Sequence, residues 1–317
     1  MKRIALIISI ALVGIGLVAF PMVSNYLFAT HASTATQQYD DTIRDTDAEK
    51  IQQMLAEATV YNENLEGNPA HDPFLQGSGM AMADNYASVL RMDNKGTMGY
   101  ITIPQIGVKL SIFHSTTDSV LESGVGHLEG SSLPIGGAGT HAVLTGHTGL
   151  AHAKMFTDLR ELKQGAVFYL HVLGQTLAYE VDQIKVVEPE ITEDLRKIPD
   201  QDYCTLITCT PYGVNSHRLL VRGTRIEYNP EVEQQLMNDS PQTFQWFTQW
   251  NLVIGAATGT VVAIVIVLLL LKRKKKETKG GQEPWDSQTQ SIPANTGGTN
   301  KKRKKVPTKY WWEEENG

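Results

Sequence analysis

Residues 205–226 read TLITCTPYGVNSHRLLVRGTRI, two strand-like runs with a loop between them. β-Branched and other apolar residues dominate 205–208 and 218–226, while proline and glycine mark the loop, so the pattern predicts two short strands. Cys209 lies where the first strand ends. Because a strand end fixes a side chain and leaves its tip reachable, Cys209 is a candidate nucleophile. The competing interpretation is a buried cysteine that packs as a small apolar side chain.

The strand-like alternation begins at Met98 and recurs along the chain up to this stretch. Further segments that show it are 100–104, 108–112, 141–144, 166–170, 178–181 and 184–187. About eight short strands punctuated by glycine and proline predict an all-β fold, either a closed barrel or a sandwich. Only short helices are expected among the strands, such as Ala151–Leu162.

A helix and a long loop precede the strands. Apolar residues recur at helical spacing between Asp40 and Tyr61, and Asp47 is the expected N-cap. Residues 62–80 lose this periodicity and are rich in glycine and proline. A loop of this length is often functional. On sequence alone, however, the tripeptide Asp72-Pro73-Phe74 within it reads as an ordinary turn.

Both ends of the chain contain candidate membrane segments. Ile4–Phe20 is an apolar run behind two cations; both an uncleaved anchor and a cleaved signal peptide fit it, and we favour the anchor. Leu252–Leu271 has 20 residues without a charge, enough to cross ~30 Å of hydrocarbon, and five cations follow at once. This predicts a transmembrane helix. Residues 272–317 are predicted to form a basic, disordered tail.

The net charge divides the chain into the same parts. Residues 1–28 and 272–317 carry +2 and +6, and the middle carries −14, so that the whole chain has a net charge of −6. Positive ends around an acidic middle predict cytosolic termini and an exported middle. The acidic balance argues against nucleic-acid binding. Two cysteines exclude a disulfide-rich scaffold and a cysteine-rich metal site, and no loop shows a calcium-binding spacing.

A histidine and an arginine can be combined with Cys209. His147 also ends a strand, before a glycine turn, and an imidazole is the usual partner that activates a thiol. Spacing does not select it among the histidines of the β region, which include His114, His127, His141, His152 and His217. Arg218 faces the thiol if the loop doubles back as a hairpin, and there it can bind an oxyanion. Arg222 has the same strand parity, and a surface cation is the other interpretation of Arg218.

Three stretches together resemble the active-site region of sortases, most closely the class C sortases that build pili in Gram-positive bacteria. They are residues 205–223 of the stretch quoted above, GHLEGSSLPIGG at 126–137 and TGHTGL at 145–150. The resemblance spans residues 40–275 and includes the second membrane segment, which is typical of class C. It implies an all-β fold with short helices: an eight-stranded sortase β-barrel, an N-terminal helix and lid loop, and flanking transmembrane helices.

The resemblance also implies roles for individual residues. Cys209 is implied to be the nucleophile of a cysteine transpeptidase and His147 its general acid/base. Arg218 is implied to bind the substrate or the oxyanion.

Class C sortases often carry a lid whose Asp-Pro-aromatic motif plugs the site, and Asp72-Pro73-Phe74, the lid motif, matches it. Asp72 is then expected to pair with Arg218, and the ring of Phe74 to cover Cys209. Tryptophan is common at the aromatic position. Because phenylalanine is smaller and lacks the indole N–H, we expect a looser lid in this chain.

The implied reaction is pilus polymerisation. Cys209 attacks an LPxTG-like sorting signal between Thr and Gly, and a lysine amine of the next pilin subunit resolves the thioester. The implied partners are pilin subunits or surface proteins with such signals, together with membrane lipid. No nucleic acid, metal or organic cofactor is expected.

Three alternatives stay open. A sortase that anchors surface proteins to peptidoglycan differs only in its acceptor. A secreted cysteine protease or an L,D-transpeptidase-like enzyme also combines cysteine and histidine on β structure. The non-enzymatic interpretation is a membrane-tethered adhesin or sensor with a degenerate site.

The expected domain organisation follows from these patterns. It comprises an N-terminal membrane anchor or signal peptide (1–28), the helix and lid loop (29–97), the catalytic barrel (98–230), a juxtamembrane linker (231–251), the transmembrane helix (252–271) and the tail (272–317). The expected location is the cell membrane, with the catalytic domain extracellular and the C-terminal tail cytosolic.

Overall fold

The computed structural model describes residues 2–65, 72–74, 85–240 and Gly259. The chain divides into two compact units, residues 1–258 and residues 259–317. Apart from Gly259, the predicted transmembrane helix at 252–271 lies outside the described residues, and so does the predicted tail at 272–317.

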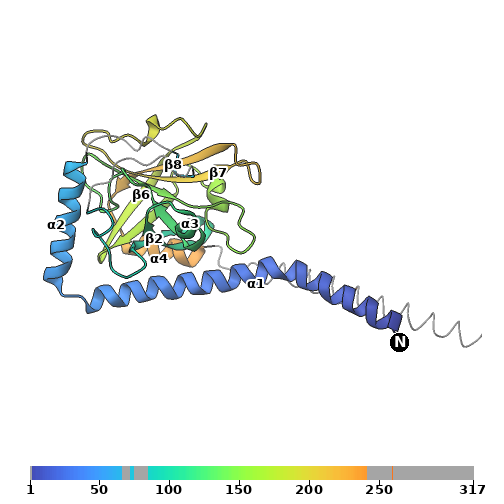
Figure 1. Ribbon diagram of the computed structural model, residues 1–317. Coiled ribbons are helices and arrows are strands. Elements are labelled where there is room, and N and C mark those ends of the chain that lie inside the picture. The colour runs from blue at the N-terminus through green and yellow to red at the C-terminus, as the bar shows by residue number, and fades with distance from the viewer. Residues whose placement is uncertain (1, 66–71, 75–84, 241–258, 260–317) are drawn as a thin grey trace, which may run out of the picture. The chain divides into compact units, whose positions relative to one another are not determined.

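Eight strands within the described residues form a closed barrel (Figure 1). They are β1 (Thr97–Ile103), β2 (Val108–His114), β3 (Val125–His127), β4 (Thr140–Thr145), β5 (Val167–Val172), β6 (Gln175–Val187), β7 (Asp202–Thr210) and β8 (His217–Ile226). Their order around the barrel is β1-β2-β3-β4-β7-β8-β6-β5, and β5 pairs with β1 to close it. The predicted all-β fold with an eight-stranded barrel is therefore confirmed.

Two strands differ from the prediction. Residues 178–181 and 184–187, predicted as two strands, belong to β6, whose register against β8 shifts between Val181 and Gln183. A bulge of this kind bends a strand without ending it, so the break in the alternation is not a turn. β3 escapes the prediction because its three residues are too few to show an alternating pattern.

The pairing of β4, β7 and β8 positions the functional site. β4 and β7 are parallel, whereas β7 and β8 form an antiparallel hairpin. Because parallel strands end on the same side of a sheet, the segments that follow β4 and β7 emerge at one rim of the barrel, where β8 also begins.

Buried side chains lie on both faces of these strands. The main core includes Leu144, Leu206 and Val221, and a second buried cluster contains Leu128, Val143, Leu195, Ile207 and Leu220. Since adjacent residues of a strand point to opposite faces, Leu206 and Ile207 belong to different clusters. We call the second cluster the outer floor, because its side chains point away from the barrel interior.

Two long helices precede the barrel. α1 (Lys2–Asp45) and α2 (Ala48–Asn64) are separated by a short break, at which the chain turns sharply (Figure 1). The predicted helix between Asp40 and Tyr61 is thus divided. Its main part begins after Asp47, which occupies the N-cap position, and residues 40–45 belong to α1.

The C-terminal half of α1 is fastened to the barrel. Tyr39 is buried, with 5% of the residue exposed. Its hydroxyl donates to the Met98 carbonyl (2.8 Å) and accepts from the Leu173 amide (2.9 Å). The N-terminal half is apolar. Within Leu12–Asp45, an 18-residue window has a mean hydropathy of 1.8 and is not buried, so this one helix of the described residues is long and apolar enough to cross a membrane. A signal sequence meets the same criterion, so the anchor stays a prediction.

The remaining helices are short: η1 (Pro104–Ile106), α3 (Asp118–Ser123), η2 (Thr157–Glu161), η3 (Glu193–Leu195) and α4 (Pro230–Asp239). The predicted helix Ala151–Leu162 is wrong over most of its length, since only η2 is helical there. Residue Met155 has a φ of 45°, which a right-handed helix does not accommodate. α4 occupies the start of the predicted linker 231–251, and the side chain of Asn229 caps it by accepting from the Glu231 amide (2.9 Å).

Candidate active site

Cys209 and Arg218 are directly opposite each other in the β7–β8 hairpin. Opposed residues of an antiparallel pair project from the same face, with Cβ atoms about 5 Å apart. The guanidinium therefore lies beside the thiol, on the face that also carries Ile207 of the outer floor. The hairpin loop also holds Arg218, because Nη1 of this residue donates to the carbonyls of Asn215 and His217, at 3.1 Å each.

His147 follows β4 at the same height as Cys209. Thr145 pairs with Ile207 in the parallel register, and two more residues on each strand lead to His147 and Cys209. The Gly146 amide continues the ladder by donating to the Ile207 carbonyl (3.0 Å). The hydroxyl of Thr208 donates to the Gly146 carbonyl (2.7 Å). The structure thus brings together a histidine and a cysteine that are far apart in the sequence.

Phe156 holds the backbone on the other side of His147. Its amide donates to the His147 carbonyl (3.0 Å), and its ring is fully buried. A Cβ placed on Gly146 would lie 2.7 Å from the Cδ2 atom of this ring. Glycine is therefore required at position 146 for the ring and the histidine backbone to pack as they do.

We expect Gly146→Ala to lower the unfolding free energy by about 1–3 kcal/mol, because the added methyl overpacks the Phe156 ring. Peptide cleavage should fall with it, since the displaced ring shifts the backbone of His147. Thermal unfolding and cleavage assays measure the two effects. The double variant Gly146→Ala/Phe156→Leu should recover part of the loss; additive losses would show that the clash is not the cause.

The lid motif lies directly on these residues. Nε of Arg218 donates to Oδ1 of Asp72 (2.8 Å), and Nη2 pairs with Oδ2 of the same carboxylate. Both residues are buried, with 7% of Arg218 and 5% of Asp72 exposed. The Phe74 ring lies 5.0 Å from Cζ of Arg218 and 5.8 Å, between centroids, from the His147 ring. The aromatic residue expected over Cys209 therefore makes its ring contacts with His147 and Arg218.

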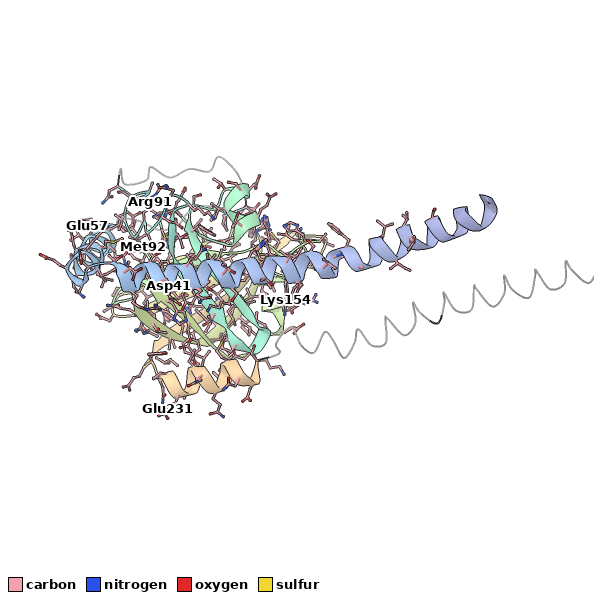
Figure 2. All side chains as sticks on the ribbon, turned by 90° about the horizontal axis from the view of Figure 1, so that it is seen from below. Asp41, Glu57, Arg91, Met92, Lys154 and Glu231 are labelled. Carbon is pink, nitrogen blue, oxygen red and sulfur yellow. The ribbon has the colours of Figure 1, made fainter. Side chains whose placement is uncertain are left out.

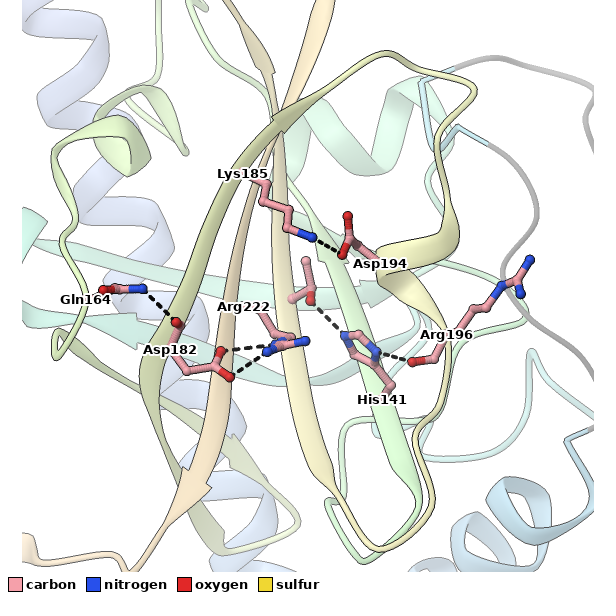
Figure 3. A network of polar contacts seen from close by, with 8 residues as sticks. His141, Gln164, Asp182, Lys185, Asp194, Arg196 and Arg222 are labelled. Atoms are coloured by element: carbon pink, nitrogen blue, oxygen red, sulfur yellow. Dashed lines mark hydrogen bonds and ion pairs between the residues drawn. The ribbon is translucent and has the colours of Figure 1, made fainter.

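Arg222, the other arginine of the same strand parity, is engaged elsewhere. Its guanidinium donates to Asp182 (2.7 and 3.1 Å) and lies 4.2 Å from the Tyr203 ring centroid. Figure 3 shows this pair beside two contacts that hold the β6–β7 connection, Lys185 with Asp194 and His141 with the Arg196 carbonyl. This connection carries Leu195 of the outer floor.

The comparisons with known proteins agree with this arrangement. The sortase domain family matches residues 101–226. Sortase C-1 from Actinomyces oris is similar in structure, with 53% identity, coverage of 56% of this chain and 99% of that chain, and a TM-score of 0.54. The pilus-related sortase C of Group B Streptococcus is 43% identical to this chain, with a TM-score of 0.56. The match covers 61% of this chain and 97% of that chain. This chain is a member of the sortase family, class C.

Among curated relatives, sortase A from Bacillus anthracis is 33% identical over 135 residues, 42% of this chain. The match spans 61% of the length of that relative.

The environment of the sortase site disfavours the thiolate. Burial raises the pKa of the Cys209 thiol, and Asp72 adds to this, while Arg218 acts in the opposite direction. Burial lowers the pKa of His147, against the effect of Asp118 and Glu122. At neutral pH both the thiol and the imidazole are therefore predominantly neutral while the lid motif covers them. The thiolate is the reactive form of a cysteine, so the covered arrangement keeps Cys209 in its less reactive form.

Two other histidines of the sortase barrel are bound into the structure. Burial lowers the pKa of His127 and of His141 to about 4. The nitrogens of His127 lie 2.9 Å from the Tyr86 hydroxyl and 2.9 Å from the Ser132 carbonyl. Within the described residues, no group of three or more His, Cys, Asp or Glu side chains is arranged to hold a metal ion.

Sequence reasoning did not identify three features of the sortase site: Thr208, Phe156 and the outer floor. One signal for the floor exists in the sequence. Residues 141–144 and 205–208 are apolar or small at nearly every position, which is typical of strands buried on both faces. Thr208 and Phe156 act through backbone contacts that only the fold creates.

Proposed function

We propose that this sortase cleaves LPxTG-like sorting signals between Thr and Gly and transfers the acyl part to a lysine amine of the next pilin subunit. The observation that carries the proposal is the placement of Cys209 opposite Arg218, at the height of His147. A nucleophile, a proton carrier and an oxyanion donor then face one substrate position.

The outer floor is the surface on which the signal would lie. Phe74 packs against this apolar cluster, together with Val187. When the lid motif leaves, the floor is uncovered next to Cys209, and the leucine and proline of the signal can replace the aromatic ring. The same movement removes the Asp72 carboxylate from Arg218. The guanidinium donors then become available for the substrate.

The reaction needs two proton transfers through His147. The thiol proton of Cys209 passes to His147, and the thiolate attacks the threonine carbonyl. Arg218 donates hydrogen bonds to the oxyanion that forms. His147 gives the proton to the glycine amine as it leaves, so that a thioester remains. The lysine amine then attacks the thioester, its proton returns through His147, and the thiol is regenerated.

The choice of acceptor is supported by class membership. The similar protein of Group B Streptococcus is pilus-related. The alternative, anchoring of surface proteins to peptidoglycan, is consistent with the similarity to sortase A of Bacillus anthracis. We further propose that the N-terminal half of α1 anchors the protein in the cell membrane, with the barrel outside and the C-terminal tail in the cytosol.

The test uses the full chain in detergent micelles and a fluorogenic LPxTG peptide. A lid-open variant, Asp72→Ala/Phe74→Ala, should cleave the peptide, and adding Cys209→Ala should lower the rate by roughly three orders of magnitude or more. With a pilin fragment that bears an acceptor lysine, mass spectrometry should detect an isopeptide-linked product.

Each contrary result has its own meaning. Cleavage that survives Cys209→Ala would show that the nucleophile is assigned wrongly. A product formed with a peptidoglycan amine and not with the pilin lysine would favour the anchoring function. Release of the free acid alone, whatever amine is supplied, would identify a protease.

A further inference from the structure

The apolar helix α1 contacts the loop that leads away from the candidate catalytic histidine. Oδ1 of Asn25 accepts a hydrogen bond from the backbone amide of Lys154 (2.8 Å). One turn along the helix, the Phe28 ring lies 6.4 Å from the His152 ring, edge to face. Figure 2 shows Lys154 beside α1. A helix expected to serve as an anchor thus touches residues 152–154, five to seven positions after His147.

The residues of this contact line a pocket between α1 and the barrel. The pocket has a volume of about 190 Å³, and Asn25, Phe28, Lys154 and Met155 are among the residues that line it. Lys154 is fixed from the barrel side as well. Its Nζ donates to the Ile106 carbonyl (2.8 Å) and pairs with Asp158 (2.6 Å). The hydrogen bond that the Lys154 amide donates to Asn25 therefore links the helix to a residue that is already attached to the barrel.

The loop holds a strained conformation between two fixed points. Met155 has a φ of 45°, in the left-handed region that non-glycine residues rarely adopt, and only 2% of it is exposed. Such a residue keeps its conformation only when contacts on both sides enforce it. On one side is Lys154, bound to Asn25; on the other is Phe156, whose amide donates to the His147 carbonyl.

We propose that Asn25 is a positioning residue for His147. The chain of contacts runs from Asn25 to Lys154, through Met155 to Phe156, and from the Phe156 amide to the His147 carbonyl. The anchor helix is then part of the active-site scaffold. In the anchored protein, Asn25 lies five residues beyond the apolar run that ends at Phe20, about 8 Å along the helix axis. The inference rests on the proposed catalytic function of His147.

The test measures peptide cleavage by the full chain in detergent micelles, in the lid-open variant. Asn25→Leu keeps the approximate size of the side chain and removes the acceptor. We expect kcat to fall roughly three- to tenfold with KM nearly unchanged, because the substrate surface lies elsewhere and only the placement of His147 is affected. Asn25→Asp retains an acceptor for the Lys154 amide and should restore kcat.

Two controls separate positioning from general damage. Thr30→Leu changes an exposed position of α1, whose hydroxyl bonds within the helix to the Tyr26 carbonyl (2.9 Å), and should leave kcat unchanged. The alkylation rate of Cys209 and the melting temperature should be the same in all the position-25 variants, since Cys209 is held by β7 and β8.

Three results would overturn the inference. They are an Asn25→Leu variant as active as Thr30→Leu, an Asn25→Asp variant as impaired as Asn25→Leu, and an equal loss of alkylation or thermal stability. The proposed function fails separately, if the lid-open parent shows no Cys209-dependent cleavage at all.

Discussion

Cleavage of a sorting-signal peptide by the full chain is expected to rise by roughly one to two orders of magnitude when Asp72 and Phe74 are both replaced by alanine. The double substitution removes two contacts of the closed state: the buried ion pair of Asp72 with Arg218, and the Phe74 ring that packs against Arg218 and His147. Breaking a buried pair costs about 3–5 kcal/mol when the remaining charge stays buried, and less here because loss of the lid side chains lets water reach Arg218. That cost applies to the closed state alone, because an open lid leaves Asp72 in water, so the equilibrium shifts towards the open site.

The rate at which a small alkylating reagent modifies Cys209 gives a second, independent measurement of lid opening. Burial and Asp72 both raise the pKa of this thiol, whereas Arg218 lowers it. In the lid-open variant the Asp72 charge is absent and Cys209 is less buried, so both causes of the raised thiol pKa are removed or weakened. The effect of Arg218, which lowers this pKa, remains. The pH midpoint of alkylation should therefore move to lower pH, and the rate at neutral pH should rise.

Asp182→Ala is the matched control for this prediction. It breaks the ion pair with Arg222, which lies on the same strand and face as Arg218 but outside the lid contacts. Alkylation of Cys209 should stay at the wild-type rate. If the lid-open variant were no faster than Asp182→Ala in both assays, the contacts of the lid motif would not restrain the site.

Replacement of Arg218 by methionine in the lid-open variant should lower kcat/KM by roughly two to three orders of magnitude. The guanidinium lies opposite Cys209 and is held by the carbonyls of Asn215 and His217. In the proposed mechanism its remaining donors, freed from Asp72, bind the oxyanion. Arg218→Lys keeps the charge but loses the planar pair of donors, and an intermediate rate is expected.

Arg222→Met provides the comparison, because Arg222 has the same strand parity and is bound to Asp182. It should leave kcat/KM within a few-fold of the parent. Alkylation at a pH high enough to ionise the thiol in every variant checks that Cys209 is still accessible. A loss of cleavage as large in Arg222→Met as in Arg218→Met would argue against a specific function for Arg218.

Local patterns in the sequence determined the elements of this sortase. Alternating apolar residues predict most of the strands, and the position of Cys209 at a strand end is visible without any fold. Helical spacing after Asp47 locates the main part of α2. This reasoning fails at β6 and β3. In β6 a bulge interrupts the period-two alternation, and the three residues of β3 are too few to show it.

Local patterns did not decide which residues meet; the family resemblance implied it, and the tertiary structure gives the physical reason. The β region contains seven histidines, among which spacing does not select, and the parallel pairing of β4 with β7 places His147 level with Cys209. The register of β8 likewise separates Arg218, at the thiol, from Arg222, at Asp182. The contact of Asn25 with Lys154 joins residues 129 positions apart. Strand propensity depends on neighbours in the chain, whereas pairing and register depend on which distant surfaces are buried together, and that information exists only in the folded barrel.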